Sequence, residues 1–241
     1  MYDEKPFSLD QFTTQEVENG IKACGNDGPR YVSSVRDGIE TGDMQDIEPE
    51  PIAKALFSVA NLDVYNPTTV TARNLFLDFL GGDMPEEAET FSEHLLDRSV
   101  YLASSLVIDT LGDPDVRARA ASVSVDAIKE QRYTSEETLY VLADALLTAS
   151  RSRGGMPFSI IASYLVAELC CGKHKLSCSD NMRDIIMTGV IDTYAAWIKA
   201  DSYNRGNHIN DLEMGLGEKV FNQRQEERIR ELIDVYRSPG A

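Results

Sequence analysis

Residues 112–120 read Gly-Asp-Pro-Asp-Val-Arg-Ala-Arg-Ala, and in this stretch one apolar helical segment ends and the next begins with almost no loop. Asp113 can cap the new helix by accepting a backbone N–H, and Pro114 follows where its missing N–H costs nothing. Val116 and Ala120 are four residues apart, so they lie on one face of the helix. The stretch therefore predicts two consecutive helices that pack against each other.

The same arrangement recurs along the chain. Helices that begin near a proline are predicted at Pro29, Pro67, Pro114 and Pro157, at intervals of 38, 47 and 43 residues. The Asp-Pro-x-Val-Arg-x-x-Ala pattern of residues 113–120 resembles the turn and second helix of a HEAT repeat, and HEAT and armadillo repeats are ~40–47 residues long. Only this stretch carries the motif closely. The resemblance implies that each two-helix hairpin buries its apolar face against the next one.

Apolar residues at helical spacing predict helices over most of the chain, and no segment shows the sustained alternation of a strand. We therefore expect an all-α protein, a HEAT-like α-solenoid of about five antiparallel helix pairs that forms one domain over residues 1–241. An irregular globular helical bundle is the alternative. The predicted pairs cover residues 13–40, 50–81, 86–130, 135–171 and 180–237.

Three segments carry more specific predictions. The helical region from Pro85 to Leu111 is longer than most globular helices, so we expect a break near residues 97–99. The apolar segment from Phe158 to Cys171 predicts a buried helix. Residues 201–217 are polar and predict a loop, and a long loop within a compact domain is often functional; a tolerated insertion within the last unit is the alternative. Its candidate contact residues are Tyr203, Arg205 and His208.

The net charge of −17 comes from 40 Asp and Glu against 23 Lys and Arg, and the acids are spread over nearly every segment. This dispersed excess, with only 8 Lys, suggests a salt-rich cytoplasm, as in a halophilic archaeon or its virus; an acidic face for a basic partner is the alternative. Nucleic-acid binding is disfavoured because phosphate contacts need a concentrated basic patch. Without a secretory signal pattern or an apolar run of ~18 residues, the chain is expected to be cytoplasmic and not membrane-bound.

Several arginines fall at or near the starts of the proline-led helices. In a stacked solenoid these starts line up along one edge, so a row of arginines there can receive acidic groups of a protein partner. The alternative is structural, with Arg117 and its counterparts paired to Asp113, Asp115 or Asp109 between neighbouring units. The residues of this predicted row are Arg30, Arg73, Arg117, Arg119, Arg151 and Arg153.

One cluster has the residue types of a metal site. Cys171, His174 and Cys178 have spacings that can wrap a tetrahedral zinc, with Cys24 or His208 as a distant fourth ligand. A second Cys pair, which a strong zinc signature has, is missing nearby. We therefore favour cysteines that finish a buried helix as small apolar residues, and we expect no metal and no cofactor.

The sequence carries no glycine-rich phosphate loop and no nucleophile elbow, so no residue is predicted to be catalytic. We expect a non-catalytic scaffold or adaptor that presents a curved helical surface to a protein partner. The alternatives are a HEAT-like enzyme, a nucleic-acid-binding protein, and a structural subunit of a viral or cellular assembly. The enzyme alternative rests on an analogy of fold, and fold alone does not determine function.

Overall fold

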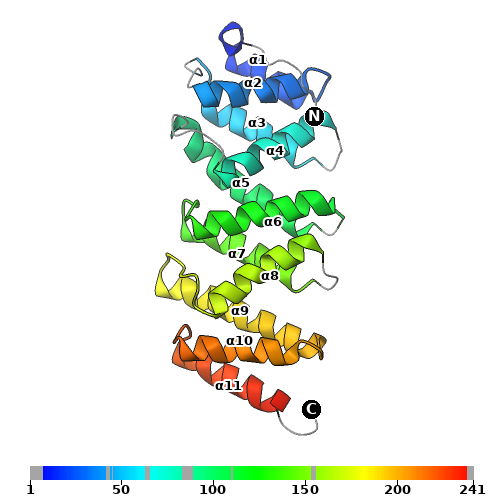
Figure 1. The fold of residues 1–241 in the computed structure, drawn as a ribbon. Coiled ribbons are helices and arrows are strands. Elements are labelled where there is room, and N and C mark those ends of the chain that lie inside the picture. Colours follow the sequence, from blue (N-terminus) through cyan, green and yellow to red (C-terminus); the bar gives the residue numbers. More distant parts are fainter. Residues whose placement is uncertain are drawn as a thin grey trace. The chain divides into compact units, whose positions relative to one another are not determined.

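A computed structural model describes residues 8–41, 44, 46–62, 66–82, 89–109, 111–152 and 156–237. Over these residues the chain forms α-helices and one short 3-10 helix, η1 (Leu9–Gln11), and no strand, which confirms the all-α prediction. The helices are α1 (Thr14–Lys22), α2 (Gly28–Thr41), α3 (Pro49–Ala60), α4 (Pro67–Gly81), α5 (Glu89–Ile108), α6 (Pro114–Lys129), α7 (Glu136–Ser150), α8 (Pro157–Cys170), α9 (Asp180–Ala200), α10 (Arg205–Gly217) and α11 (Gln223–Arg237) (Figure 1).

Local sequence signals set where most of these helices begin. Before α1, the Thr13 hydroxyl accepts from the Glu16 backbone N–H at 3.3 Å, and the Glu16 carboxylate accepts from the Thr13 N–H at 2.8 Å. Asp113 caps α6 by accepting from the Asp115 N–H at 2.8 Å, with Pro114 in the first turn, as predicted. Such side chains satisfy donors that the first turn leaves without an intrahelical partner.

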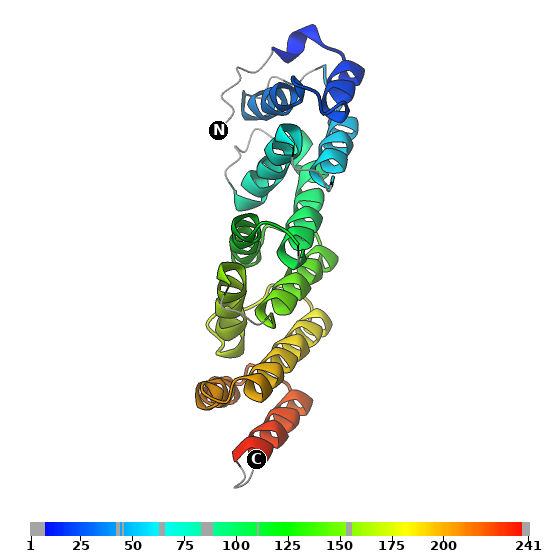
Figure 2. The same cartoon turned by 90° about the vertical axis from the view of Figure 1, so that its right-hand side faces the viewer.

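The contacts divide the chain into two compact units. The first unit spans residues up to Ala103 together with Arg132–Thr134, so it contains α1 to α4 and most of α5. In it α1 packs on α2 and α3, and α4 packs on α2 and α3, which places α1 and α3 in one layer and α2 and α4 in the other (Figure 2). The core between the layers includes Val35, Ile52 and Leu56, which have no exposed surface.

The second unit contains residues 104–131 and 135–241, and thus α6 to α11. Neighbouring helices pack on each other, and α6 also packs on α8, α7 on α9 and α9 on α11. Figure 2 shows α6, α8 and α10 on one side of this unit and α7 and α9 on the other. Ala162, Val190 and Ile198 are fully buried between the layers. The prediction of one domain over the whole chain stays a prediction.

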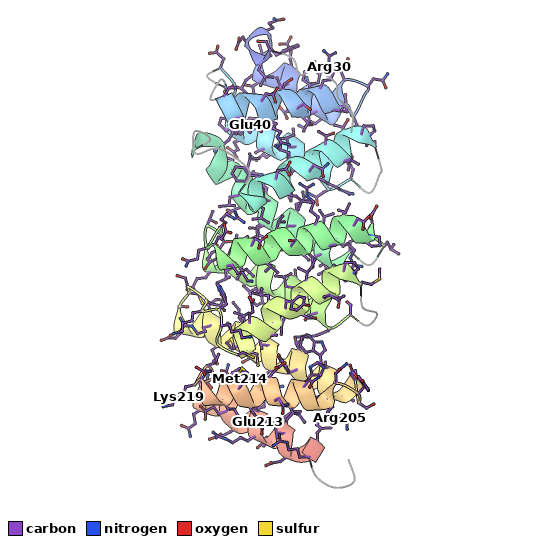
Figure 3. All side chains as sticks on the ribbon, viewed as in Figure 1. Arg30, Glu40, Arg205, Glu213, Met214 and Lys219 are labelled. Carbon is purple, nitrogen blue, oxygen red and sulfur yellow. The ribbon has the colours of Figure 1, made fainter. Side chains whose placement is uncertain are left out.

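Two sequence predictions about helix boundaries are wrong. α5 has no break near residues 97–99 but runs as one helix from Glu89 to Ile108, within which the hydroxyl of the buried Ser99 donates to the Leu95 carbonyl at 2.8 Å. The predicted loop over residues 201–217 is for the most part the helix α10, whose Ile209 and Leu212 are buried, and α11 begins at Gln223. Figure 3 shows Arg205 at the beginning of α10 and Lys219 just beyond its end.

Among the described residues, every helix falls short of the length and apolar character that a membrane span requires.

Candidate functional site

The second unit has a groove of about 960 Å³ between α8 and α10, above the C-terminal half of α9. α10 contacts α8 much less extensively than α8 contacts α6, so the regular packing of next-but-one helices is interrupted here. The residues that line this α8–α10 groove are Ser150, Arg151, Ser152, Ser159, Ile160, Ser163, Tyr164, Ala167, Tyr194, Ala196, Trp197, Lys199, Ala200, Asp201, Asn204, His208 and Asp211. The interruption thus exposes faces of α8, α9 and α10 that would otherwise be covered.

The partly exposed rings of Trp197 and His208 form the floor of the groove, and the fully buried Tyr194 ring packs against both. The Trp197 ring lies 4.9 Å from the Tyr194 ring in an edge-to-face arrangement and 5.2 Å from the His208 ring. The Trp197 indole N–H donates to the Ser150 carbonyl at 2.9 Å, and the Tyr194 hydroxyl donates to the Asp211 carboxylate at 3.1 Å. Because both polar ends are bonded within the protein, the ring faces are held in place without a ligand.

One wall of the groove is an exposed stripe on α8. Ile160 and Tyr164 are four residues apart and leave 45% and 69% of their surface exposed. The hydroxyls of Ser159 and Ser163 are turned back onto the carbonyls of Ser152 and Ser159, at 3.2 and 2.7 Å. The sequence predicted a buried helix here; the structure corrects this, because only the opposite face of α8, with Ala162, is in the core.

The charged groups of the groove differ in how many hydrogen bonds and ion pairs they form within the protein. The Asp201 carboxylate accepts from the side-chain amide and the backbone N–H of Asn204 and from the backbone N–H of Tyr203, and these bonds hold the pKa of Asp201 below its usual value. Lys199 is exposed, and no carboxylate of the described residues pairs with Lys199 or with Arg151. Within the described part of the chain, the two groove cations are thus not ion-paired.

His208 is partly buried among the other rings. Burial lowers the pKa of His208, and the nearby carboxylates of Asp201 and Asp211 oppose this shift less strongly. This environment favours the uncharged form of the imidazole, whose flat face lies against the Trp197 ring.

Two residues of the predicted arginine row, Arg73 and Arg117, donate to carbonyls at the ends of helices. Arg73 donates to the carbonyls of Ala60 and Leu62, at 2.7 and 2.9 Å, beyond the end of α3. Arg117 donates from Nε and from a terminal nitrogen to the Val107 carbonyl, at 3.2 and 3.0 Å. These carbonyls are among those that a helix end leaves without an N–H partner.

The prediction that Arg117 pairs with a neighbouring aspartate is wrong. Asp109, Asp113 and Asp115 make no ion pair with it in the described part of the chain, and its guanidinium instead lies 3.6 Å from the centre of the Phe158 ring. Arg117 thus makes an intramolecular contact, as in the structural alternative, but its acceptor is a backbone carbonyl.

The other predicted contact residues are dispersed. Arg205 donates to the Ile198 carbonyl at 3.1 Å and lies 5.0 Å from the Tyr236 ring centre, and Arg30 pairs with Asp27 at 3.3 Å. Arg119 is exposed on α6 and Tyr203 is 94% exposed, while Arg153 lies outside the described residues. Of the predicted set, Arg151 and His208 are the two that line the α8–α10 groove.

The candidate zinc ligands are not assembled. The described residues contain no group of three or more His, Cys, Asp and Glu side chains that could hold a metal ion. The Cys171 thiol is buried and lies 4.0 Å from the Asp211 carbonyl, and burial raises its pKa. His174 and Cys178 lie in the segment between α8 and α9, and all four cysteines are free thiols.

The sequence prediction missed the main groove residues Ile160, Tyr164 and Trp197. A signal for them exists in α8, where Ile160, Ser163, Tyr164 and Ala167 follow the spacing of one helix face opposite the core residues. A helix that is apolar around its whole circumference buries more than one face, either in the core or under a partner.

Searches against protein-family models, curated proteins and solved structures give no match to this chain. The site is therefore interpreted from its own residues.

Proposed function

We propose that this protein is a non-catalytic interaction scaffold, a HEAT-like α-solenoid that binds a protein partner through the α8–α10 groove. The observation that carries the proposal is the interruption of packing between α8 and α10, which leaves Trp197, His208 and Tyr164 at the surface of a concave site. Concave sites lined by aromatic side chains with a few polar groups are the usual places of ligand recognition.

The chemistry of the groove suits recognition of a protein surface. Trp and Tyr are enriched among the residues that contribute most to protein–protein affinity, because their large rings lose little conformational entropy on binding. Trp197 is already fixed by its bond to Ser150, and Tyr164 projects from α8 with 69% of its surface exposed. Covering these faces removes apolar surface from water, which is the main driving force of association.

The solenoid part of the proposal rests on how the helices pack within each unit. Contacts between next-but-one helices, such as α2 with α4 and α6 with α8, are typical of stacked helical hairpins. The prolines at the starts of α4, α6 and α8 support a repeated hairpin unit. Stacking of this kind leaves broad helical surfaces for a partner.

A salt-rich cytoplasm is the proposed location. The charge of −17 is dispersed over the chain, and the cysteines are free thiols, as is usual in a reducing compartment. In concentrated salt the repulsion among the carboxylates is screened over a few ångströms, so a highly acidic surface costs less there.

The test is comparative capture of partners from an extract of the source cells, in their own salt, on three immobilised proteins: the native chain, Ile160→Asp and Ile185→Asp. Ile185 is the matched control, because it is 44% exposed on α9 but does not line the groove. We expect a partner that the native chain and I185D retain equally and that I160D loses by about tenfold or more. The same captured proteins on all three supports would contradict the proposal.

A further inference from the structure

The charges of the α8–α10 groove restrict what can occupy it. The chain as a whole has 40 acidic against 23 basic residues, but the groove has two cations, Arg151 and Lys199, and two carboxylates. Both carboxylates are engaged: Asp201 accepts hydrogen bonds at the start of α10, and Asp211 accepts from Tyr194. Both keep their negative charge, but among the described residues neither forms an ion pair with Arg151 or Lys199.

The cations themselves keep unused hydrogen-bonding capacity. Arg151 donates from Nε to the Thr193 hydroxyl, at 2.9 Å, and from one terminal nitrogen to the Gly189 carbonyl, at 3.1 Å. The Lys199 ammonium has no hydrogen bond or ion pair with a described residue. A partner that covers the groove removes water from both groups, and this costs free energy unless the partner supplies acceptors.

We infer that the occupant of the groove is an acidic segment of the partner protein, with a large apolar side chain flanked by carboxylates. The apolar side chain packs on Trp197 and against the stripe of Ile160 and Tyr164, and the carboxylates meet Lys199 and Arg151. This inference rests on the proposed function. A basic segment is disfavoured because it would place like charges beside two cations in a partly desolvated site.

The negative net charge of the chain does not prevent an acidic segment from binding in the groove. Charges farther apart than a Debye length, about 8 Å at physiological salt and less at higher salt, are largely screened. In the proposed complex the carboxylates of the occupant meet Arg151 and Lys199 directly, at a shorter distance than the carboxylates dispersed over the rest of the chain.

The experiment is selection of short random peptides displayed on phage against the immobilised full-length chain, with I160D as counter-selection. Retained peptides are then synthesised without tryptophan and titrated into the chain while the emission of Trp197, its only tryptophan, is followed. We expect the retained peptides to be net acidic, with an aromatic or aliphatic residue next to the carboxylates.

The second part of the experiment reverses the charge of one groove cation. Lys199→Glu is expected to weaken the selected peptides by about fivefold or more, while Lys175→Glu, an equal charge change outside the groove, changes affinity less than about twofold. Peptides that depend on Ile160 but lack an acidic bias, or that bind K199E unchanged, would overturn the inference and leave the proposed function standing.

Two further outcomes concern the site itself. If no peptide distinguishes the native chain from I160D, the groove is not a contact site, and the proposed function fails together with the inference. If the native chain self-associates in light scattering and I160D does not, the occupant is a second copy of this chain, and the inference of an acidic partner segment is wrong.

Discussion

Replacement of Arg117 by methionine tests whether the motif arginine stabilises the fold through a carbonyl rather than through an aspartate. The native side chain donates twice to the Val107 carbonyl and lies 3.6 Å from the Phe158 ring centre. A bond from a charged donor contributes about 1.5–3 kcal/mol, and a partly desolvated cation–π contact about 0.5–2 kcal/mol. Methionine keeps part of the aliphatic stem but supplies neither, so we expect the free energy of unfolding to fall by about 2–4 kcal/mol.

The assay is urea unfolding followed by circular dichroism, with two comparison variants. Arg117→Lys keeps the charge but loses the planar fork, so an intermediate loss is expected. Arg119→Met removes an exposed arginine two residues away, and its cost is expected to stay below about 1 kcal/mol. If R117M and R119M lost equal amounts, the bond to the Val107 carbonyl would not be what makes this arginine important.

Three further predictions concern backbone geometry and pH. Gly172→Ala should lower the free energy of unfolding by about 1–2 kcal/mol, since Gly172 has φ +68° and an added Cβ would lie 2.8 Å from a Val220 methyl; a neutral result in urea unfolding would contradict this. Lys219→Gly should raise stability by about 0.5–1 kcal/mol in the same assay, since Lys219 has φ +56°, and a loss would refute the strain argument. Burial lowers the pKa of His208 in the folded chain, so as the pH drops the unfolded chain binds a proton at this histidine first. The thermal stability should therefore fall as the pH drops through 6.5, and it should fall less in His208→Gln. An equal pH dependence of the two proteins would contradict this prediction.

The helix starts were predictable because each depends on a few neighbouring residues. Asn66, Asp113 and Ser135 accept from backbone N–H groups within three residues of themselves, and the prolines of α4 and α6 need only their own fixed φ. Such interactions are contained in a short stretch of sequence, so the sequence predicts them well.

α10 was missed because its stability depends on residues far away in the chain. Gly206, Gly215 and Gly217 are poor helix formers, and nothing near them in sequence offsets this. In the fold, Gly215 lies so close to the Cys170 carbonyl and the Phe221 ring that an added Cβ would be 2.3 and 2.6 Å from them. Tight packing against the last residue of α8 and the segment before α11 thus selects a residue that local propensity disfavours.

The groove was not predictable for a related reason. The spacing of Ile160 and Tyr164 indicates a second apolar face on α8, but spacing alone does not say whether another helix covers that face. That depends on how closely α10 approaches α8, which is set by packing in three dimensions. Arg151 and His208 were selected from the sequence, yet their place beside Trp197 follows only from the fold.

The most direct test of the account is acrylamide quenching of Trp197 with and without the captured partner. As the only tryptophan of the chain, lying in the groove and partly exposed, it reports on this site provided that the partner's own tryptophans are replaced or spectrally separated. We predict that the free chain is readily quenched and that saturation with partner lowers the quenching constant several-fold. An unchanged quenching constant in a complex shown to be saturated would contradict the claim that the partner occupies the α8–α10 groove.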